Sequence, residues 1–296
     1  MEHGSARTLL GGVVDYAGLF PPAALDMAAA VGAYAEARAG ADAWMLGRFV
    51  LPAARLGEFA AARAGLPSGS EAWLVSAIVR DRSPEDAEAV MRFNRDAAGD
   101  VARVDSIECR PETIDGIDWL AATFGEPFEV YAEIAPGPEA PAWLSRVAAR
   151  RLRAKVRTGG VTAEAFPPPD ALLAWLDAAV GAGVAFKATA GLHHAVRGPY
   201  RLTYEPGSPS APMYGYLNVL LATAALADGR SREVARHLLT RDAATALDIG
   251  MEGVRWDDVT LSTAALARAR AAHLVSFGSC SFGEPSGEYR ALASRA

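Results

Sequence analysis

The chain has 296 residues, of which 51% are hydrophobic and 22% are charged, so it is long enough to bury a sizeable core. Its formal net charge of −6 and its pI of about 5.5 argue against nucleic acid or an anionic membrane as the main partner. Two cysteines are too few for a disulfide framework and the first residues do not resemble a secretory leader, so we expect a cytoplasmic protein.

Short apolar segments typical of strands recur about every thirty residues, which is the length of one strand–helix unit. Each is flanked by segments rich in Ala, Leu, Arg and Glu, which are typical of helices. The regular spacing and the lack of a linker favour one closed (β/α)8 TIM barrel over residues 1–296, rather than an open doubly wound sheet. The expected strands span residues 12–16, 43–49, 73–79, 101–108, 128–134, 152–157, 184–189 and 273–279.

Helix-start signals fall between these strands. Ser83 followed by Pro84 predicts a capped helix start, Pro141 predicts the opening of a helix over residues 143–151, and Asp170 predicts the cap of a helix over residues 171–180.

The interval between the seventh and eighth strands is about sixty residues longer than one unit requires. We expect a helical insertion over residues 195–260, with helices over residues 213–227 and 231–247. The first of these helices is too apolar to lie in solvent. The insertion is therefore expected to cover the barrel mouth or to form a subunit contact in a homo-oligomer, in the simplest case a dimer.

Lys155 and Lys187 are the only lysines among the 29 Lys and Arg residues. Arg cannot form an imine or give up its proton in a protein, whereas a desolvated Lys can do both. The two lysines lie on consecutive expected strands, which would be neighbours about 4.8 Å apart. Two ammonium groups so close repel each other, which predicts that the pKa of at least one of them falls and that a neutral amine is available near pH 7.

In a barrel, side chains at the carboxyl ends of the strands converge on one site. Lys155 and Arg157 share a face because alternate residues of a strand point the same way. Acids at this end could transfer protons to and from a substrate, or pair with nearby arginines. The expected strands place the following polar residues on or near this end: Asp15, Arg48, Asp105, Glu108, Glu133, Lys155, Arg157, Lys187 and Ser279.

The segments around the lysines resemble the deoxyribose-phosphate aldolases, class I aldolases built on a (β/α)8 barrel. That family carries Lys-Thr-Ser-Thr-Gly on its sixth strand and Phe-Lys-x-x-Gly-Gly on its seventh. Here Lys155-Val-Arg-Thr158-Gly159 is similar to the first segment and Phe186-Lys187-Ala-Thr-Ala-Gly191 to the second. The likeness is specific around the lysines, loose over the rest of residues 15–191, and resumes at the eighth strand. Its fainter parts are at Asp15, Val104-Asp105, Val130-Tyr-Ala-Glu133 and Phe277-Gly278-Ser279.

The resemblance implies that Lys155 forms a Schiff base with a small carbonyl substrate and that Lys187 lowers its pKa. It implies a proton relay through Asp105, and we add Glu133, on the segment similar to the family's Glu-bearing fifth strand, as a catalytic candidate. It also implies that Gly278 and Ser279 hold a phosphate. The candidate substrate-binding residues are Asp15, Arg48, Arg157, Thr158, Gly159, Gly160, Gly191, His193, His194, Gly278 and Ser279.

The sequence departs from the family's pattern at three of these positions and in its length. Arg157 stands where the family has a small serine, and His193-His194 replaces an ending of the Gly-Val-Arg type. The insertion has no counterpart. These departures concern the identity of the substrate.

His193 and His194 are expected to contact the substrate or its phosphate, or else to bond to the loop backbone. Adjacent histidines point in different directions, so one metal ion rarely takes both, and we expect no metal site. The paired glycines lack the spacing of a nucleotide-binding loop, so we expect no cofactor.

Three functions remain open. The first is a Schiff-base-forming aldolase or lyase that acts on a small carbonyl compound, with or without a phosphate. The second is a non-covalent or metal-assisted lyase or isomerase, in which the lysines bind an anion or polarise a carbonyl group. The third is a catalytically silent barrel used for binding or assembly.

Overall fold

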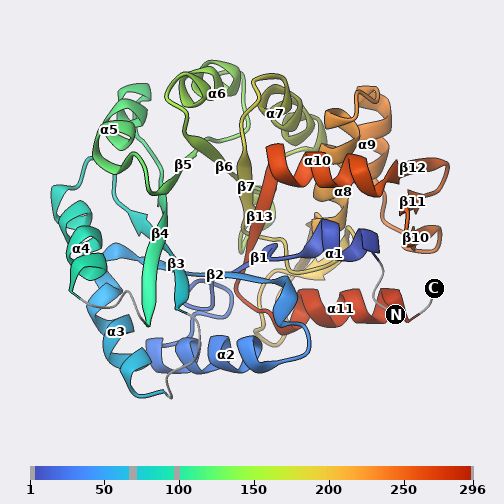
Figure 1. The fold of residues 1–296 in the computed structure, drawn as a ribbon. Helices are drawn as coiled ribbons and strands as arrows, with labels where there is room; N and C mark the ends of the chain where they lie inside the picture. The colour runs from blue at the N-terminus through green and yellow to red at the C-terminus, as the bar shows by residue number, and fades with distance from the viewer. Residues whose placement is uncertain (1–3, 67–71, 97–100, 295–296) are drawn as a thin grey trace.

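The chain folds as a closed barrel of eight parallel strands surrounded by helices, as the strand–helix repeat predicts (Figure 1). This computed structural model describes residues 4–66, 72–96 and 101–294. Residues 1–3, which belong to the segment that we expect not to be a secretory leader, lie outside the described residues. Around the barrel the strands follow the order β1-β13-β7-β6-β5-β4-β3-β2. Their bounds are β1 Val14–Tyr16, β2 Leu46–Pro52, β3 Trp73–Val79, β4 Ala102–Cys109, β5 Glu129–Glu133, β6 Arg153–Arg157, β7 Phe186–Thr189 and β13 Leu274–Ser279.

A helix follows each of the first six strands and the last one. The Ser83 hydroxyl accepts the Asp86 N–H at 3.2 Å and Pro84 is the first residue of α4, which confirms the predicted start. The prediction that Asp170 caps the next helix was wrong. Helix α7 begins at Pro169, so Asp170 is already its second residue. The helices are α1 Gly4–Leu10, α2 Met27–Ala39, α3 Leu56–Ala64, α4 Pro84–Arg95, α5 Ile114–Phe124, α6 Ala140–Ala149, α7 Pro169–Gly181, α8 Tyr216–Ala227, α9 Arg232–Thr240, α10 Thr263–Ala272 and α11 Gly283–Ala293, with short 3₁₀ turns η1 Ala43–Met45, η2 Ala53–Arg55 and η4 Ala163–Ala165.

The second strand begins three residues later than predicted. Residues 43–45 form the 3₁₀ turn η1, so β2 spans Leu46–Pro52 instead of residues 43–49. Arg48 is therefore the third residue of the strand and lies toward its amino end, where the prediction had placed it at the carboxyl end.

The insertion between β7 and β13 is partly helical and partly β-structure. It contains the hairpin of β8 (Gly198–Arg201) and β9 (Ser210–Met213), then α8 and α9, then an antiparallel sheet, then α10. The expected helix over residues 231–247 ends at Thr240. Beyond it, β10 (Leu247–Ile249), β11 (Gly253–Trp256) and β12 (Val259–Ser262) pair as an antiparallel sheet. Val254 and Trp256 of β11 are buried two residues apart, as expected of a strand with one buried face.

Helix α8 is buried inside the chain itself. Eleven of its twelve residues are buried, it packs against α7, α9 and α10, and the Tyr216 ring stacks on Phe277 of β13 with ring centroids 4.8 Å apart. The apolar helix is therefore covered without a partner subunit. A dimer stays a prediction, but α8 is not available as its interface. Within the described ranges, no helix is long and apolar enough to cross a membrane.

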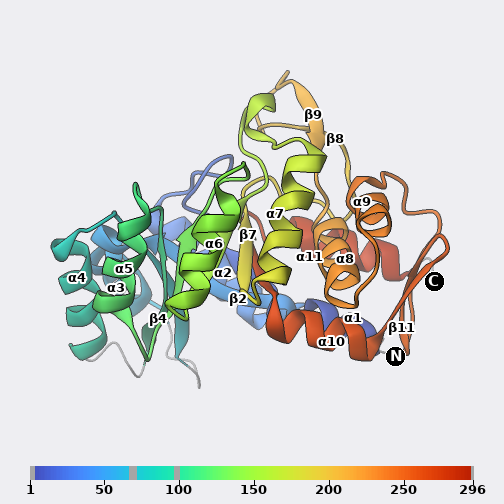
Figure 2. The same cartoon turned by 90° about the horizontal axis from the view of Figure 1, so that it is seen from above.

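The hairpin β8–β9 projects at the top of Figure 2 and has a small apolar cluster of its own. Leu202, Ala211 and Met213 form this cluster, and Phe166 from the loop after β6 packs against it. The hairpin is therefore anchored to the loop that follows one of the two lysine-bearing strands.

Candidate active site

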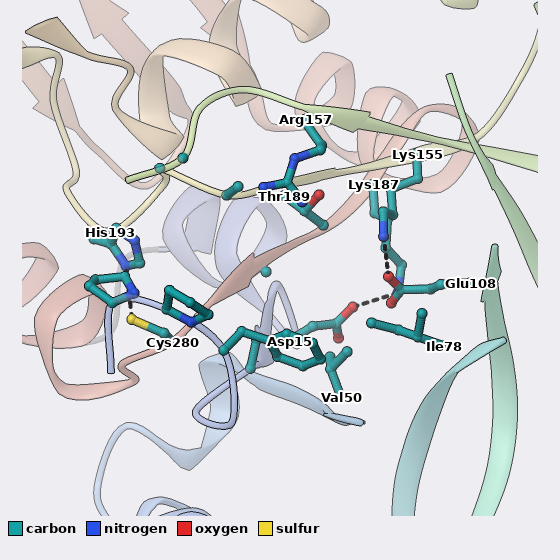
Figure 3. A pocket seen from close by; sticks show the side chains of 18 of the residues that line it. Asp15, Val50, Ile78, Glu108, Lys155, Arg157, Lys187, Thr189, His193 and Cys280 are labelled. Carbon is teal, nitrogen blue, oxygen red and sulfur yellow. Dashed lines mark hydrogen bonds and ion pairs between the residues drawn. The ribbon is translucent and has the colours of Figure 1, made fainter. Parts of the chain in front are cut away.

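Lys155 and Lys187 lie side by side and point into the barrel. They are register partners on β6 and β7, and paired residues of parallel strands point to the same face. Lys155 Nζ lies 2.9 Å from one carboxylate oxygen of Glu108 on β4, and Lys187 Nζ lies 2.8 Å from the other (Figure 3). The prediction of two lysines on adjacent strands facing one site is confirmed.

Each lysine has one further carboxylate partner. Lys155 Nζ lies 3.0 Å from Glu133 at the end of β5, and Lys187 Nζ lies 2.9 Å from Asp15 on β1. Lys187 also lies over the Tyr131 ring, 4.4 Å from its centroid, and is 0% exposed, whereas Lys155 is 6% exposed. Lys155 is therefore the more accessible amine.

The pKa values of both lysines are raised, contrary to the prediction. Burial lowers the pKa of Lys155, but the attraction of the Glu108 and Glu133 carboxylates outweighs this effect. Burial also lowers the pKa of Lys187, and there the attraction of Asp15 and Glu108 outweighs it. Burial raises the pKa of Glu108, but the two ammonium groups together bring it well below its ordinary value. Repulsion between the lysines was overestimated because the carboxylate between them was not considered.

Hydroxyl and backbone donors hold two of these carboxylates in place. Ser76 Oγ donates to Glu108 at 2.8 Å, while Ser276 Oγ and the Arg48 backbone N–H donate to Asp15 at 2.8 and 2.9 Å. Sequence reasoning put Glu108 at the carboxyl end of its strand without a role and did not single out the two serines. For the two serines, the available signal was a polar residue at an inward position of a mostly apolar strand.

A cavity of about 250 Å³ opens above the lysines. Its charged and polar lining comes from residues at the carboxyl ends of several strands, and the rest is mostly apolar. Loops after β1, β6 and β7 complete the wall. The lining residues that bear on its chemistry are Asp15, Glu108, Lys155, Arg157, Lys187, Thr189 and His193, with Phe20, Pro21, Pro22, Val50, Ile78 and Val161 as the larger apolar ones.

Arg48 and Asp105 do not reach this cavity. Arg48 bonds to Asp105 through Nε and Nη2 at 2.7 and 2.9 Å, and its Nη2 lies 3.0 Å from Glu129. Glu129 and Arg153, which pair at 2.8 Å, are the first residues of β5 and β6, so this cluster lies at the amino end of the barrel. Their expected place beside the lysines was wrong, because β2 starts late and Asp105 lies at a register shift between β3 and β4.

Thr158 and Gly159 support the loop backbones. Buried Thr158 donates through Oγ1 to the Ala190 carbonyl at 2.7 Å, which ties the end of β6 to that of β7. A Cβ on Gly159 would overlap the Phe166 ring, and a Cβ on Gly191, whose φ is +76°, would lie 2.8 Å from the same ring. Gly160, Gly191 and Gly278 line the cavity through their backbones.

The two histidines have different surroundings. Nδ1 of His193 lies 3.2 Å from Ser279 Oγ and 3.7 Å from Cys280 Sγ, at the other end of the cavity from the lysines (Figure 3). Burial, followed by the charge of His194, lowers the pKa of His193 to about 4, so it is neutral at pH 7. His194 stacks on Tyr200 and pairs with Glu288 at 2.6 Å, in a hollow beside the cavity.

No protein-family model and no curated protein matches this sequence. The resemblance to the deoxyribose-phosphate aldolases therefore remains a proposal that depends on the site. In the part of the chain that the structure describes, no group of three or more His, Cys, Asp or Glu side chains is arranged to hold a metal ion.

Proposed function

We propose that this chain is a Schiff-base-forming lyase of the aldolase kind that acts on a small carbonyl compound. The observation that supports it best is the position of Lys155. Its amine lies at the floor of a small cavity, slightly accessible, with the carboxylates of Glu108 and Glu133 at 2.9 and 3.0 Å. An amine, a proton acceptor and an enclosed space above them are the parts that imine formation needs.

The proton has a short route away from the amine. Lys155 passes one proton to Glu133, and the neutral Nζ then forms a bond to the carbonyl carbon of the substrate. The carbonyl oxygen takes a proton from the new ammonium, which gives the neutral carbinolamine. Glu133 returns its proton to that hydroxyl group, water leaves, and a positively charged iminium remains on Lys155 beside Glu108.

The iminium then acts as an electron sink. When the Glu133 carboxylate takes the proton of a hydroxyl group on the β carbon, that carbon becomes a carbonyl carbon, the bond between the α and β carbons breaks, and its electron pair moves to the iminium, which becomes an enamine; in reverse, the bond forms. Lys187 holds Glu108 and Asp15 in place as a fixed counter-charge. Being fully buried and bonded to both carboxylates, it is the poorer nucleophile of the two.

One observation favours a second function, a non-covalent lyase or isomerase. Both lysines have raised pKa values, so in the resting site they are ammonium groups that can polarise a carbonyl group without attacking it. In that case the substrate would never become attached to the chain.

Borohydride trapping separates the two functions. The protein is incubated with a panel of small aldehydes and ketones, reduced, digested and mapped by mass spectrometry. An adduct on Lys155 supports the Schiff-base lyase, and an adduct on Lys187 reverses the roles of the two lysines. A compound that is turned over without leaving any adduct supports the non-covalent enzyme.

A further inference from the structure

One more basic side chain faces the cavity. Arg157 is the last residue of β6, two residues after Lys155 on the same face of the strand, and it lines the cavity. Among the residues that the structure describes, no carboxylate lies within 4.0 Å of its guanidinium, whereas Arg153 on the same strand pairs with Glu129. In Figure 3 it lies with Thr189 between the lysine end and the histidine end. Arg157 is thus a cation open to a ligand.

The floor of the cavity is unsuited to an anion. Two ammonium groups there face the three carboxylates of Asp15, Glu108 and Glu133, each within 3.0 Å of a lysine nitrogen. A negatively charged group brought to the floor would be repelled by the surplus carboxylate. An anionic substrate therefore has to enter with its carbonyl end toward the lysines and its charged end toward Arg157.

The eighth strand, where the resemblance implies a phosphate site, leads into a helix that already carries a negative charge. Glu284 lies in the first turn of α11, its N–H donates to Ser281 Oγ at 3.2 Å, and its carboxylate accepts from Tyr204 at 2.9 Å. The nearest imidazole, His193, lies 3.8 Å from that carboxylate and is neutral at pH 7. A phosphate at this helix terminus would meet a carboxylate instead of a free dipole.

We propose that the substrate is a short aldehyde or ketone that carries an anionic oxygen group, and that Arg157 binds this group while Lys155 engages the carbonyl. The planar guanidinium offers two parallel N–H donors to a carboxylate or a phosphate ester. The cavity of about 250 Å³ is smaller than the sites that usually hold drug-sized ligands, which favours a short ligand. The carbonyl part rests on the proposed Schiff-base function; the anion site does not.

The anion site is tested first with ligands that contain no carbonyl carbon open to attack. Butanoate and inorganic phosphate are titrated by calorimetry at low ionic strength into the wild type, Arg157→Gln and Arg201→Gln. Arg201 lines the neighbouring hollow and serves as the matched control. We expect binding to weaken about tenfold or more in Arg157→Gln and to stay unchanged in Arg201→Gln. The anion that shows this loss identifies the group as carboxylate or phosphate.

Two results of this titration would overturn the proposal. One is that neither anion binds, or that both bind equally well to Arg157→Gln. The other is stronger binding in Glu284→Gln with no effect of Arg157→Gln, which would place the anion at α11.

A trapping experiment then tests whether Arg157 and Lys155 bind the anionic group and the carbonyl group of the same substrate. Succinic semialdehyde is compared with butanal, and glycolaldehyde phosphate with glycolaldehyde, by borohydride reduction and mapping of Lys155. We expect more adduct from the anionic member of a pair, and loss of this preference in Arg157→Gln. Equal labelling by charged and uncharged compounds would contradict the anion site while leaving the Schiff base in place. Anion binding through Arg157 without any adduct would contradict the Schiff base alone.

Discussion

At the scale of single residues, Glu108 determines the electrostatics of the site. One buried carboxylate accepts from both lysines, and Glu133 and Asp15 each pair with one of them, so each ammonium is neutralised inside the barrel even though the other lies close by. This arrangement explains why two adjacent lysines can both remain charged. It also means that Lys155 can attack a carbonyl carbon only after its ammonium group has passed a proton to Glu108 or Glu133.

We predict that Glu108→Gln destabilises the fold at pH 7 by about 3–5 kcal/mol, because two buried ammonium groups lose their shared partner. The pKa of Glu108 is lower in the folded chain than its ordinary value of 4.5, so its stabilising effect is present above that value and is lost as the pH falls below it. The difference in urea unfolding between wild type and variant should therefore narrow in acid. Glu58→Gln, which removes an exposed partner of Arg55, serves as the control and should change little. Equal stabilities of wild type and Glu108→Gln at pH 7 would contradict the bridging role.

His193 is predicted to make stability depend on pH in a second range. Its pKa is lowered to about 4, so between 6.5 and about 4 the unfolded chain binds more protons and stability falls as the pH falls. Between pH 7 and 5 this loss amounts to about 2 kcal/mol. His193→Gln should show a correspondingly smaller loss in urea unfolding over the same range. Parallel pH profiles of the two proteins would show that His193 titrates normally.

At the scale of elements, the hairpin β8–β9 lines the hollow beside the cavity and reaches Cys280 in the cavity wall. Tyr204, in the loop between its strands, lies 3.6 Å from the sulfur of Cys280, which lines the cavity and is buried. We predict that Tyr204→Ala leaves the fold intact, because this side chain is 52% exposed, and raises the rate at which Cys280 reacts with a thiol reagent several-fold. Cys109, buried in the barrel, is the internal control and should stay unreactive. An unchanged rate at Cys280 would show that the hairpin does not limit access.

Helix α8 is predicted to depend on one buried amide. Asn218 accepts the Arg197 N–H at 2.8 Å and donates to the carbonyls of Leu238 and Arg241, both at 2.7 Å. Asn218→Ala leaves these buried or partly buried backbone groups without their side-chain partner and should destabilise the fold by about 3 kcal/mol or more in urea unfolding. Thr223→Val, on the same helix, removes a hydroxyl that donates to the Val219 carbonyl one turn earlier, and should cost much less. Similar losses in both variants would contradict a special role for Asn218.

At the scale of the whole molecule, the repeat length predicted the barrel and the order of its lysine strands. A spacing near thirty residues depends only on the size of a strand–helix unit, so the predicted fold stays the same when a strand boundary is wrong by a few residues. The three-residue error at β2 had a local consequence, because it misplaced Arg48 relative to the cavity. The fold was therefore easier to predict than the position of a given side chain along its strand.

The site was predicted only where chemistry marked a residue as unusual. Lys155 and Lys187 stood out as the two lysines of the chain, whereas Glu108 was one acid among 35 Asp and Glu residues. Its role follows from a contact between β4, β6 and β7 that no local pattern reveals. The same holds for Asp105, whose pairing with Arg48 depends on a register shift in the barrel.

Trapping in matched variants shows whether Lys155 is the covalent nucleophile. Wild type, Lys155→Arg and Lys187→Arg are reduced with borohydride in the presence of the same small aldehyde, and their intact masses are compared after circular dichroism has shown that each is folded. We expect an adduct in wild type, a weaker one in Lys187→Arg and none in Lys155→Arg, because a guanidinium cannot attack a carbonyl at neutral pH. Labelling of Lys155→Arg to the same extent as wild type would contradict this role of Lys155.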